Sequence, residues 1–288
     1  MALRQLCGLL LGALLLAAMV EAEAPDLERG EYILRATGGC SCHTDISGAG
    51  VPMAGGRRLE TPFGGIYSTN ITPDPETGIG DWSDDDFIRS MTEGVGPDGT
   101  HFFPIFPYTS FARMSRRDLL DLKAYLFSLT PVRQEAPPPQ MPLPFRWRSL
   151  LGPWKALHLT RAPFTPVADS SDSWNRGAYL VTALAHCGEC HTPRNLLGGL
   201  KTELGLVGSD QPDGETAPNI TPDSDTGIGE WSEADLVWYL QTGLLPDGDS
   251  AQGTMLEVIE QGYQYLEEQD LRAIATYLLS RPARPALR

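Results

Sequence analysis

The chain has 288 residues, and 41% of them are hydrophobic, which is enough for packed cores and excludes a disordered protein. Its 37 Asp and Glu outnumber its 22 Lys and Arg and give a net charge of −15. So acidic a protein repels phosphate, which excludes nucleic acid as a main partner.

The first residues carry the features of an export signal. Arg4 precedes an apolar run over 6–20, and small residues follow at Ala22 and Ala24. This order predicts a signal peptide over 1–22, cleaved after Ala22. The alternative is an uncleaved membrane anchor, for which a run of about 15 apolar residues is short. We therefore expect a periplasmic protein, associated with the membrane only through a partner or an uncleaved signal.

The rest of the chain repeats itself. Residues 70–83, which read Asn-Ile-Thr-Pro-Asp, then Thr-Gly-Ile-Gly and Trp-Ser, return at 219–232. A Gly-x-Tyr pair at 30–32 returns at 177–179. Two copies of roughly a hundred residues indicate two similar domains.

Each copy is expected to form a few short helices. Apolar residues at helical spacing run into a pair of cysteines, a Ser-x-x-Asp capping box opens a middle helix, and a last helix closes the copy. These features lie at 32–37, 83–86 and after Ser115 in the first copy, and at 179–185, 232–235 and after Glu267 in the second. No run alternates with a period of two, so the predicted fold class is all-α.

A proline-rich stretch separates the copies. Prolines at 131, 137–139, 142 and 144 predict a stiff linker, and Trp147–His158 has the pattern of a short amphipathic helix. The predicted organisation is therefore a first domain over 25–133, a linker over 134–170 and a second domain over 171–288.

The cysteines carry most of the functional inference. Four of them form two close pairs, each directly followed by a histidine: Cys40, Cys42 and His43, then Cys187, Cys190 and His191. Such pairs serve as disulfides, zinc ligands or thioredoxin-like sites. The second pair, however, has the C-x-x-C-H pattern of covalent haem attachment, in which the thiols add to the haem vinyl groups and the imidazole binds iron. Zinc held by His186, both cysteines and His191 is the main alternative, although so short a run wraps poorly around one ion.

These motifs resemble c-type cytochromes, and more narrowly the multihaem cytochrome subunits of periplasmic alcohol, gluconate and aldehyde dehydrogenases. The resemblance rests on residues 186–193, on the repeats at 70–83 and 219–232, and on Phe106-Pro107-Tyr108. It implies two tandem cytochrome c domains joined by a Pro-rich linker, with haem c at two sites. It also implies that a dehydrogenase donates electrons, which pass towards a quinone-linked or oxidase acceptor of the respiratory chain. The chain is then an electron-transfer subunit with no activity of its own.

The resemblance also bears on the sixth iron ligand. In the second domain it points to the thioether of Met255, which such cytochromes place ahead of the last helix. In the first domain an ungapped alignment puts Phe106 at that position, and phenylalanine cannot bind iron. Met114 is one replacement, although its alignment with Leu266 also predicts packing against the last helix. His101 is another, and an open or water-bound iron is the third.

Two further expectations concern the haem surroundings. The first motif, Cys40-Ser41-Cys42-His43, lacks one residue between its cysteines, so the first site is atypical and the second complete. The repeated loops are expected to fold over the haem edge, where Asn219 and Trp231 offer N–H groups to a propionate, with a plain core role as the alternative for Trp231. The rival function is a haem enzyme or a gas or redox sensor that uses an open iron in the first domain.

Overall fold

The computed structural model describes residues 24–48 and 50–287, so the predicted signal peptide lies outside the described residues. The N-terminal half contains α1 (Leu27–Ala36), η1 (Ser41–His43), β1 (Arg58–Thr61), β2 (Gly64–Tyr67), α2 (Asp84–Glu93), α3 (Tyr108–Phe111) and α4 (Arg116–Ser128). The connecting segment contains η2 (Arg148–Leu150) and α5 (Leu151–His158). The C-terminal half contains α6 (Asp172–Tyr179), the π-helix η3 (Leu180–Leu184), α7 (Gly188–His191), η4 (Thr202–Leu204), β3 (Ser209–Asp210), β4 (Thr216–Ala217), α8 (Glu233–Thr242), α9 (Gly253–Gln261), η5 (Tyr263–Tyr265) and α10 (Glu268–Leu279).

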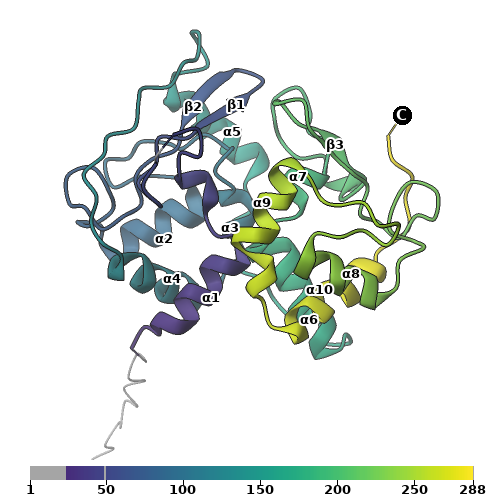
Figure 1. Ribbon diagram of the computed structural model, residues 1–288. Coiled ribbons are helices and arrows are strands. Elements are labelled where there is room, and N and C mark those ends of the chain that lie inside the picture. Colours follow the sequence, from purple (N-terminus) through teal and green to yellow (C-terminus); the bar gives the residue numbers. More distant parts are fainter. Residues whose placement is uncertain (1–23, 49, 288) are drawn as a thin grey trace, which may run out of the picture.

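The first and last helices of each half cross closely, α1 on α4 and α6 on α10 (Figure 1). A glycine makes each crossing possible. A Cβ added at Gly30 would lie 2.1 Å from the carbonyl oxygen of Asp121, and one at Gly177 would lie 1.9 Å from that of Ala273. Since no side chain fits at these distances, the repeated Gly-x-Tyr pair places its glycine at equivalent helix crossings.

The middle helices begin where the sequence predicts. Ser83 accepts a hydrogen bond from the Asp86 amide while the Asp86 carboxylate accepts from the Ser83 amide, which completes a capping box at the start of α2. Ser232 and Asp235 make the same pair of bonds at the start of α8. The last helices, α4 and α10, directly follow Ser115 and Glu267, as predicted.

The chain is helix-rich, as predicted, but it departs from a purely helical fold in two places. Two small antiparallel hairpins are present, β1–β2 and β3–β4. The larger one pairs Arg58 with Tyr67 and continues to a bridge between Gly65 and Gln140. Strands of four and two residues are too short to show a two-residue period, and Gly64 and Gly65 leave no side chains with which to display one.

The proline-rich stretch runs over the N-terminal half before it reaches η2 and α5, which together form the short helical segment predicted there. Lys155 anchors α5: its ammonium group donates to the Gly94 carbonyl at 2.7 Å and lies 2.9 Å from Nδ1 of His101. The side chain is almost fully buried and its nitrogen sits 4.8 Å from the centre of the Tyr108 ring. The connecting segment is therefore packed against the N-terminal half.

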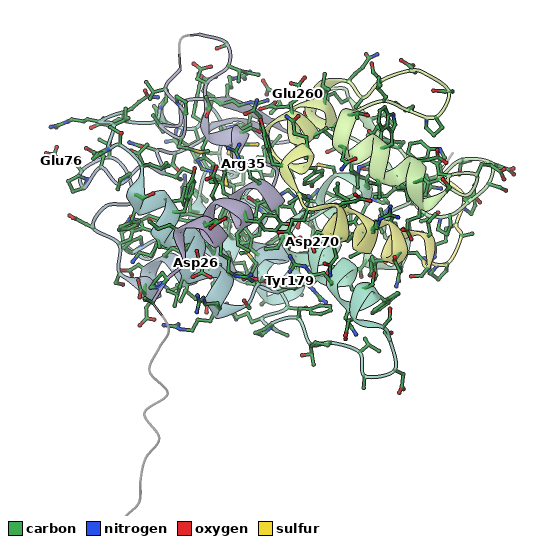
Figure 2. The ribbon with its side chains drawn as sticks, turned by 60° about the horizontal axis from the view of Figure 1, so that its bottom comes forward. Asp26, Arg35, Glu76, Tyr179, Glu260 and Asp270 are labelled. Carbon is green, nitrogen blue, oxygen red and sulfur yellow. The ribbon has the colours of Figure 1, made fainter. Side chains whose placement is uncertain are left out.

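The two halves share one hydrophobic core and exchange matching hydrogen bonds. Tyr32 donates to Asp270 at 2.6 Å, and Tyr179 donates to Asp118 at 2.5 Å. Each carboxylate is also paired with an arginine of its own half: Asp270 with Arg176, and Asp118 with Arg29. Figure 2 shows Tyr179 and Asp270 where the two halves meet. Because corresponding residues contact each other in both directions, the interface is nearly two-fold symmetric.

In the described part of the chain, no helix is long and apolar enough to cross a membrane.

Candidate functional site

The second cysteine motif forms a single helical turn that ends on an oriented histidine. The backbone amide of His191 donates to the Cys187 carbonyl at 2.9 Å, which closes the turn. Nδ1 of His191 lies 2.7 Å from the carbonyl oxygen of Pro218. Since a carbonyl only accepts, Nδ1 carries the proton and Nε2 keeps its lone pair free for a metal. Burial lowers the pKa of His191, against a smaller effect of this bond, and so favours the neutral imidazole that binds iron.

The first motif reaches the same arrangement although it is one residue shorter. Nδ1 of His43 lies 2.7 Å from the carbonyl oxygen of Thr69, the counterpart of Pro218 in the repeat. The missing residue is absorbed by the backbone: Ser41–His43 forms a 3-10 turn, and Cys40 takes a left-handed conformation with φ of 51°. Both histidines are therefore held in the orientation of an iron ligand.

Cys42 is exposed, and the other three cysteines of the two motifs are half-buried. All four are free, and desolvation raises the pKa of Cys40 to about 11, that of Cys187 to about 12 and that of Cys190 to about 11. Zinc binding and thioredoxin-like exchange both need thiolates. Within the described residues no three Cys, His, Asp or Glu side chains converge as metal ligands, and the His186 ring packs against Phe111 at 5.4 Å. The geometry thus fits thioether attachment of haem better than zinc.

The predicted sixth ligands lie in different surroundings. Met255 stands in the first turn of α9, half-buried against the core. Met114 is 2% exposed and directly precedes the Ser115 cap of α4, as Leu266 precedes Glu267 before α10. These placements match the sequence alignment but leave the ligand role of each methionine as a prediction.

Phe106 and His101, the other two residues considered at the sixth-ligand position of the first site, both contact side chains of the protein. Phe106 lies in an aromatic cluster, with ring centres 5.9 Å from Phe102 and 5.6 Å from Phe111. His101 faces the Lys155 ammonium through its Nδ1, which engages one of its two ring nitrogens. The aromatic cluster leaves no donor at the position that corresponds to Met255.

The expected propionate contact of Asn219 is wrong. Its side-chain NH₂ donates to Thr226 at 2.9 Å and to the Arg284 carbonyl at 2.7 Å, and its oxygen accepts from the Thr221 amide at 2.8 Å. Asn70 makes the same contacts in the first copy, with Thr77 and Val132. The Asn-Ile-Thr-Pro-Asp repeat therefore ties its loop to the segment that follows the last helix. Trp231 packs against Tyr239 with ring centres at 5.4 Å, which leaves its predicted role open.

Sequence reasoning missed that the helix at the expected sixth-ligand position of each half, α3 or α9, contacts the cysteine motif of the other half. Glu189, inside the second motif, is 7% exposed and accepts from Thr109 at 2.6 Å and Ser110 at 2.7 Å, both on α3. In the opposite direction, α9 contacts η1 of the first motif, and Glu257 of α9 accepts two bonds from Arg57, which lies beyond that motif, at 2.5 and 2.9 Å. No pattern in the sequence pointed to these contacts, because they join residues far apart in the chain.

Open space adjoins the first motif. A cavity of about 990 Å³ lies between the halves, with Ser41, Thr44 and Met53 on one wall and Thr254 and Glu257 on the other. This volume is at the upper end for sites that bind small molecules and cofactors. Ser41 of the first cysteine motif therefore lines a space large enough for a cofactor, whereas Cys40, Cys42 and His43 are not among the residues that line it.

Comparison with known proteins identifies the family. The chain is 43% identical over 263 residues to a protein named "Diheme cytochrome c-type" from Cereibacter sphaeroides, and the match covers 90% of this chain and 86% of the relative. The chain belongs to the c-type cytochromes. This confirms the predicted resemblance and implies haem c as the cofactor, which both oriented histidines and their neighbouring thiols fit.

Other relatives of the cytochrome are subunits of larger assemblies or longer chains. It is 48% identical over 260 residues to a nicotinate dehydrogenase subunit of Pseudomonas putida and 42% identical over 265 residues to the fructose dehydrogenase cytochrome subunit of Gluconobacter japonicus. These matches cover 90% and 91% of this chain, which spans 22% of the first relative and 54% of the second. No protein-family model matches the sequence.

Proposed function

We propose that the cytochrome is a periplasmic dihaem electron-transfer subunit that accepts electrons from a partner dehydrogenase and passes them towards the respiratory chain. Its two tandem cytochrome c domains are residues 25–133 and 171–288, joined by the linker over 134–170, and each carries one haem c. The relatives support a dehydrogenase partner, because they include cytochrome subunits of fructose and gluconate dehydrogenases and of a quinone-linked alcohol dehydrogenase.

One observation carries the proposal: the repeat places two histidines, His43 and His191, in the same hydrogen-bonded orientation after two cysteine pairs. Such a matched pair makes two one-electron centres in one chain. When bound, haem c supplies reversible one-electron chemistry. The carbonyls of Thr69 and Pro218 hold the imidazole rings in place and raise their basicity, which helps to set the reduction potential.

The two sites differ in the ligand that completes the iron. In the second domain we propose Met255, whose thioether favours a high potential. In the first domain Met114 remains the side-chain candidate, with His101 and an open iron as the others. Two sites of unequal potential give electron flow a direction within one subunit.

Copurification tests the role. The tagged cytochrome, produced in its native host with its haems attached, should copurify with a dehydrogenase. Adding that enzyme's substrate should then reduce the haem iron, which is followed by the change in the visible absorption spectrum. The haem-loaded cytochrome alone should show no reduction by the same substrate. If no dehydrogenase accompanies the cytochrome and none of those in the host reduces it, the proposal fails.

A second function has one observation in its favour. The aromatic cluster around Phe106 places no ligating atom where Met255 stands in the other half. An open iron at the first site would suit a haem enzyme or a gas or redox sensor. Carbon monoxide binding by the reduced protein, together with peroxide turnover or a ligand-dependent output, would favour that function over electron transfer.

A further inference from the structure

One end of the molecule exposes an unusual number of apolar side chains. They belong to the connecting segment and to the loop after the second cysteine motif, and we call them the apolar rim: Leu143, Phe145, Trp147, Leu150, Leu196 and Leu197. Each of these residues is between 47% and 60% exposed, except for Leu196, which is 98% exposed. In Figure 1 the connecting segment runs over the β1–β2 hairpin at this end of the molecule.

The two parts of the apolar rim are held together by the protein. The Phe145 ring stacks on Phe63 of the hairpin turn with centres 4.8 Å apart. Phe63 is also the nearest neighbour of Gly198, where an added Cβ would lie 3.7 Å from the ring. The Trp154 indole donates to the Leu197 carbonyl at 2.8 Å. The rim is therefore one preformed surface built from both halves.

The charge of these segments is opposite to that of the protein. Residues 136–168 contain no Asp or Glu but four basic residues, in a chain whose net charge is −15. Residues 190–202 also contain no carboxylate side chain, and they include Lys201. Arg146 is exposed between the two rim aromatics, and the carboxylate of the adjoining hairpin, Glu60, is paired with Arg58. Of these basic residues, Lys155 is buried and Arg161 pairs with Glu93, so the positive charge near the apolar rim comes from Arg146, Lys201 and Arg148, the last of which faces Asp98.

We propose that the apolar rim docks the cytochrome onto the interface of an anionic lipid bilayer, with Phe145, Trp147 and Leu196 entering the headgroup region. Aromatic and leucine side chains beside arginine and lysine are the composition of interfacial membrane contacts. An anionic surface attracts this region while it repels the acidic remainder, which orients the molecule. A leucine that protrudes almost completely suits a fluid bilayer better than a shaped protein groove. Binding through this surface is independent of the haem chemistry.

Vesicle flotation tests the proposal. The haem-loaded, full-length protein is mixed with vesicles of phosphatidylglycerol and phosphatidylethanolamine, and the haem absorbance that floats with the lipid is measured. Leu196→Glu removes the protruding side chain and adds a negative charge at a site that contributes almost nothing to packing. We expect it to weaken binding by about tenfold or more. Trp147→Ser should act in the same direction, and vesicles of phosphatidylcholine alone should bind the parent more weakly.

Matched controls lie elsewhere on the surface. Trp238 is 53% exposed against 55% for Trp147, and Leu244 is exposed in another loop. Trp238→Ser and Leu244→Glu should leave flotation unchanged, and every variant carries the same N-terminal residues. Equal flotation of Leu196→Glu, Trp147→Ser and the parent would overturn the proposal, since another part of the protein would then bind the lipid. Flotation that survives while association with the dehydrogenase is lost would also overturn it, and would assign the rim to a protein partner.

Discussion

The exchanged tyrosine–aspartate bonds between the halves predict a specific pattern of stability changes. Tyr32→Phe removes the hydroxyl that donates to Asp270 at 2.6 Å, and Tyr179→Phe removes the one that donates to Asp118 at 2.5 Å. Both carboxylates are buried, with 7% and 1% of their surface exposed. A hydrogen bond to a buried charged group contributes about 1.5–3 kcal/mol. Each substitution should therefore lower the free energy of unfolding by about that amount.

The chain offers a matched control for these two substitutions. Tyr108 is fully buried, and its hydroxyl has no hydrogen-bond partner among the described residues. Tyr108→Phe removes the same oxygen but no bond, so it should be neutral or slightly stabilising. The two interface sites use different partners, and the double variant of Tyr32 and Tyr179 should therefore lose about the sum of the single effects.

Urea unfolding of the haem-loaded protein, followed by far-ultraviolet circular dichroism, measures the three changes under identical conditions. If Tyr32→Phe and Tyr179→Phe cost no more than Tyr108→Phe, the exchanged bonds do not hold the halves together. A loss at only one of the two interface sites would contradict the two-fold correspondence between them.

Three further outcomes are expected. The reduced protein should bind carbon monoxide at one haem only, and Phe106→Met, which supplies a thioether at the first site, should suppress that binding and raise the potential of that haem in a spectroelectrochemical titration. Peptide mass analysis should find both cysteines of the second motif linked to haem, but attachment at the first mainly through Cys42, with part of Cys40 unlinked; complete double attachment there would contradict this. Burial, with Arg161 nearby, lowers the pKa of Lys155 to about 8. Between pH 8 and the ordinary lysine pKa of about 10.4, Lys155 is therefore protonated in more of the unfolded molecules than of the folded ones, so the stability of the folded protein rises with pH. The parent should gain stability relative to Lys155→Met across this interval, and a constant difference would show that the ammonium group is not desolvated.

Several features of the cytochrome follow from the sequence because they depend on residues close together in the chain. A capping box needs a serine and an aspartate three positions apart, and Ser83 with Asp86 forms one as predicted. A haem attachment turn needs two cysteines and the histidine that follows. The internal repeat reveals related halves by simple comparison, and the resemblance to c-type cytochromes rests on these same local patterns.

Only the tertiary structure decided what the repeated residues contact. The sequence marks Tyr32 and Asp270 as repeated positions, but their bond joins residues 238 positions apart. Nor does a sequence pattern reveal that Glu189 accepts hydrogen bonds from two residues of α3 in the opposite half. Asn219 was expected to face a propionate, and the fold instead uses its amide to fasten the chain end. A polar side chain has the same donors in any environment, so its partner depends on which distant backbone the packing brings within hydrogen-bond distance.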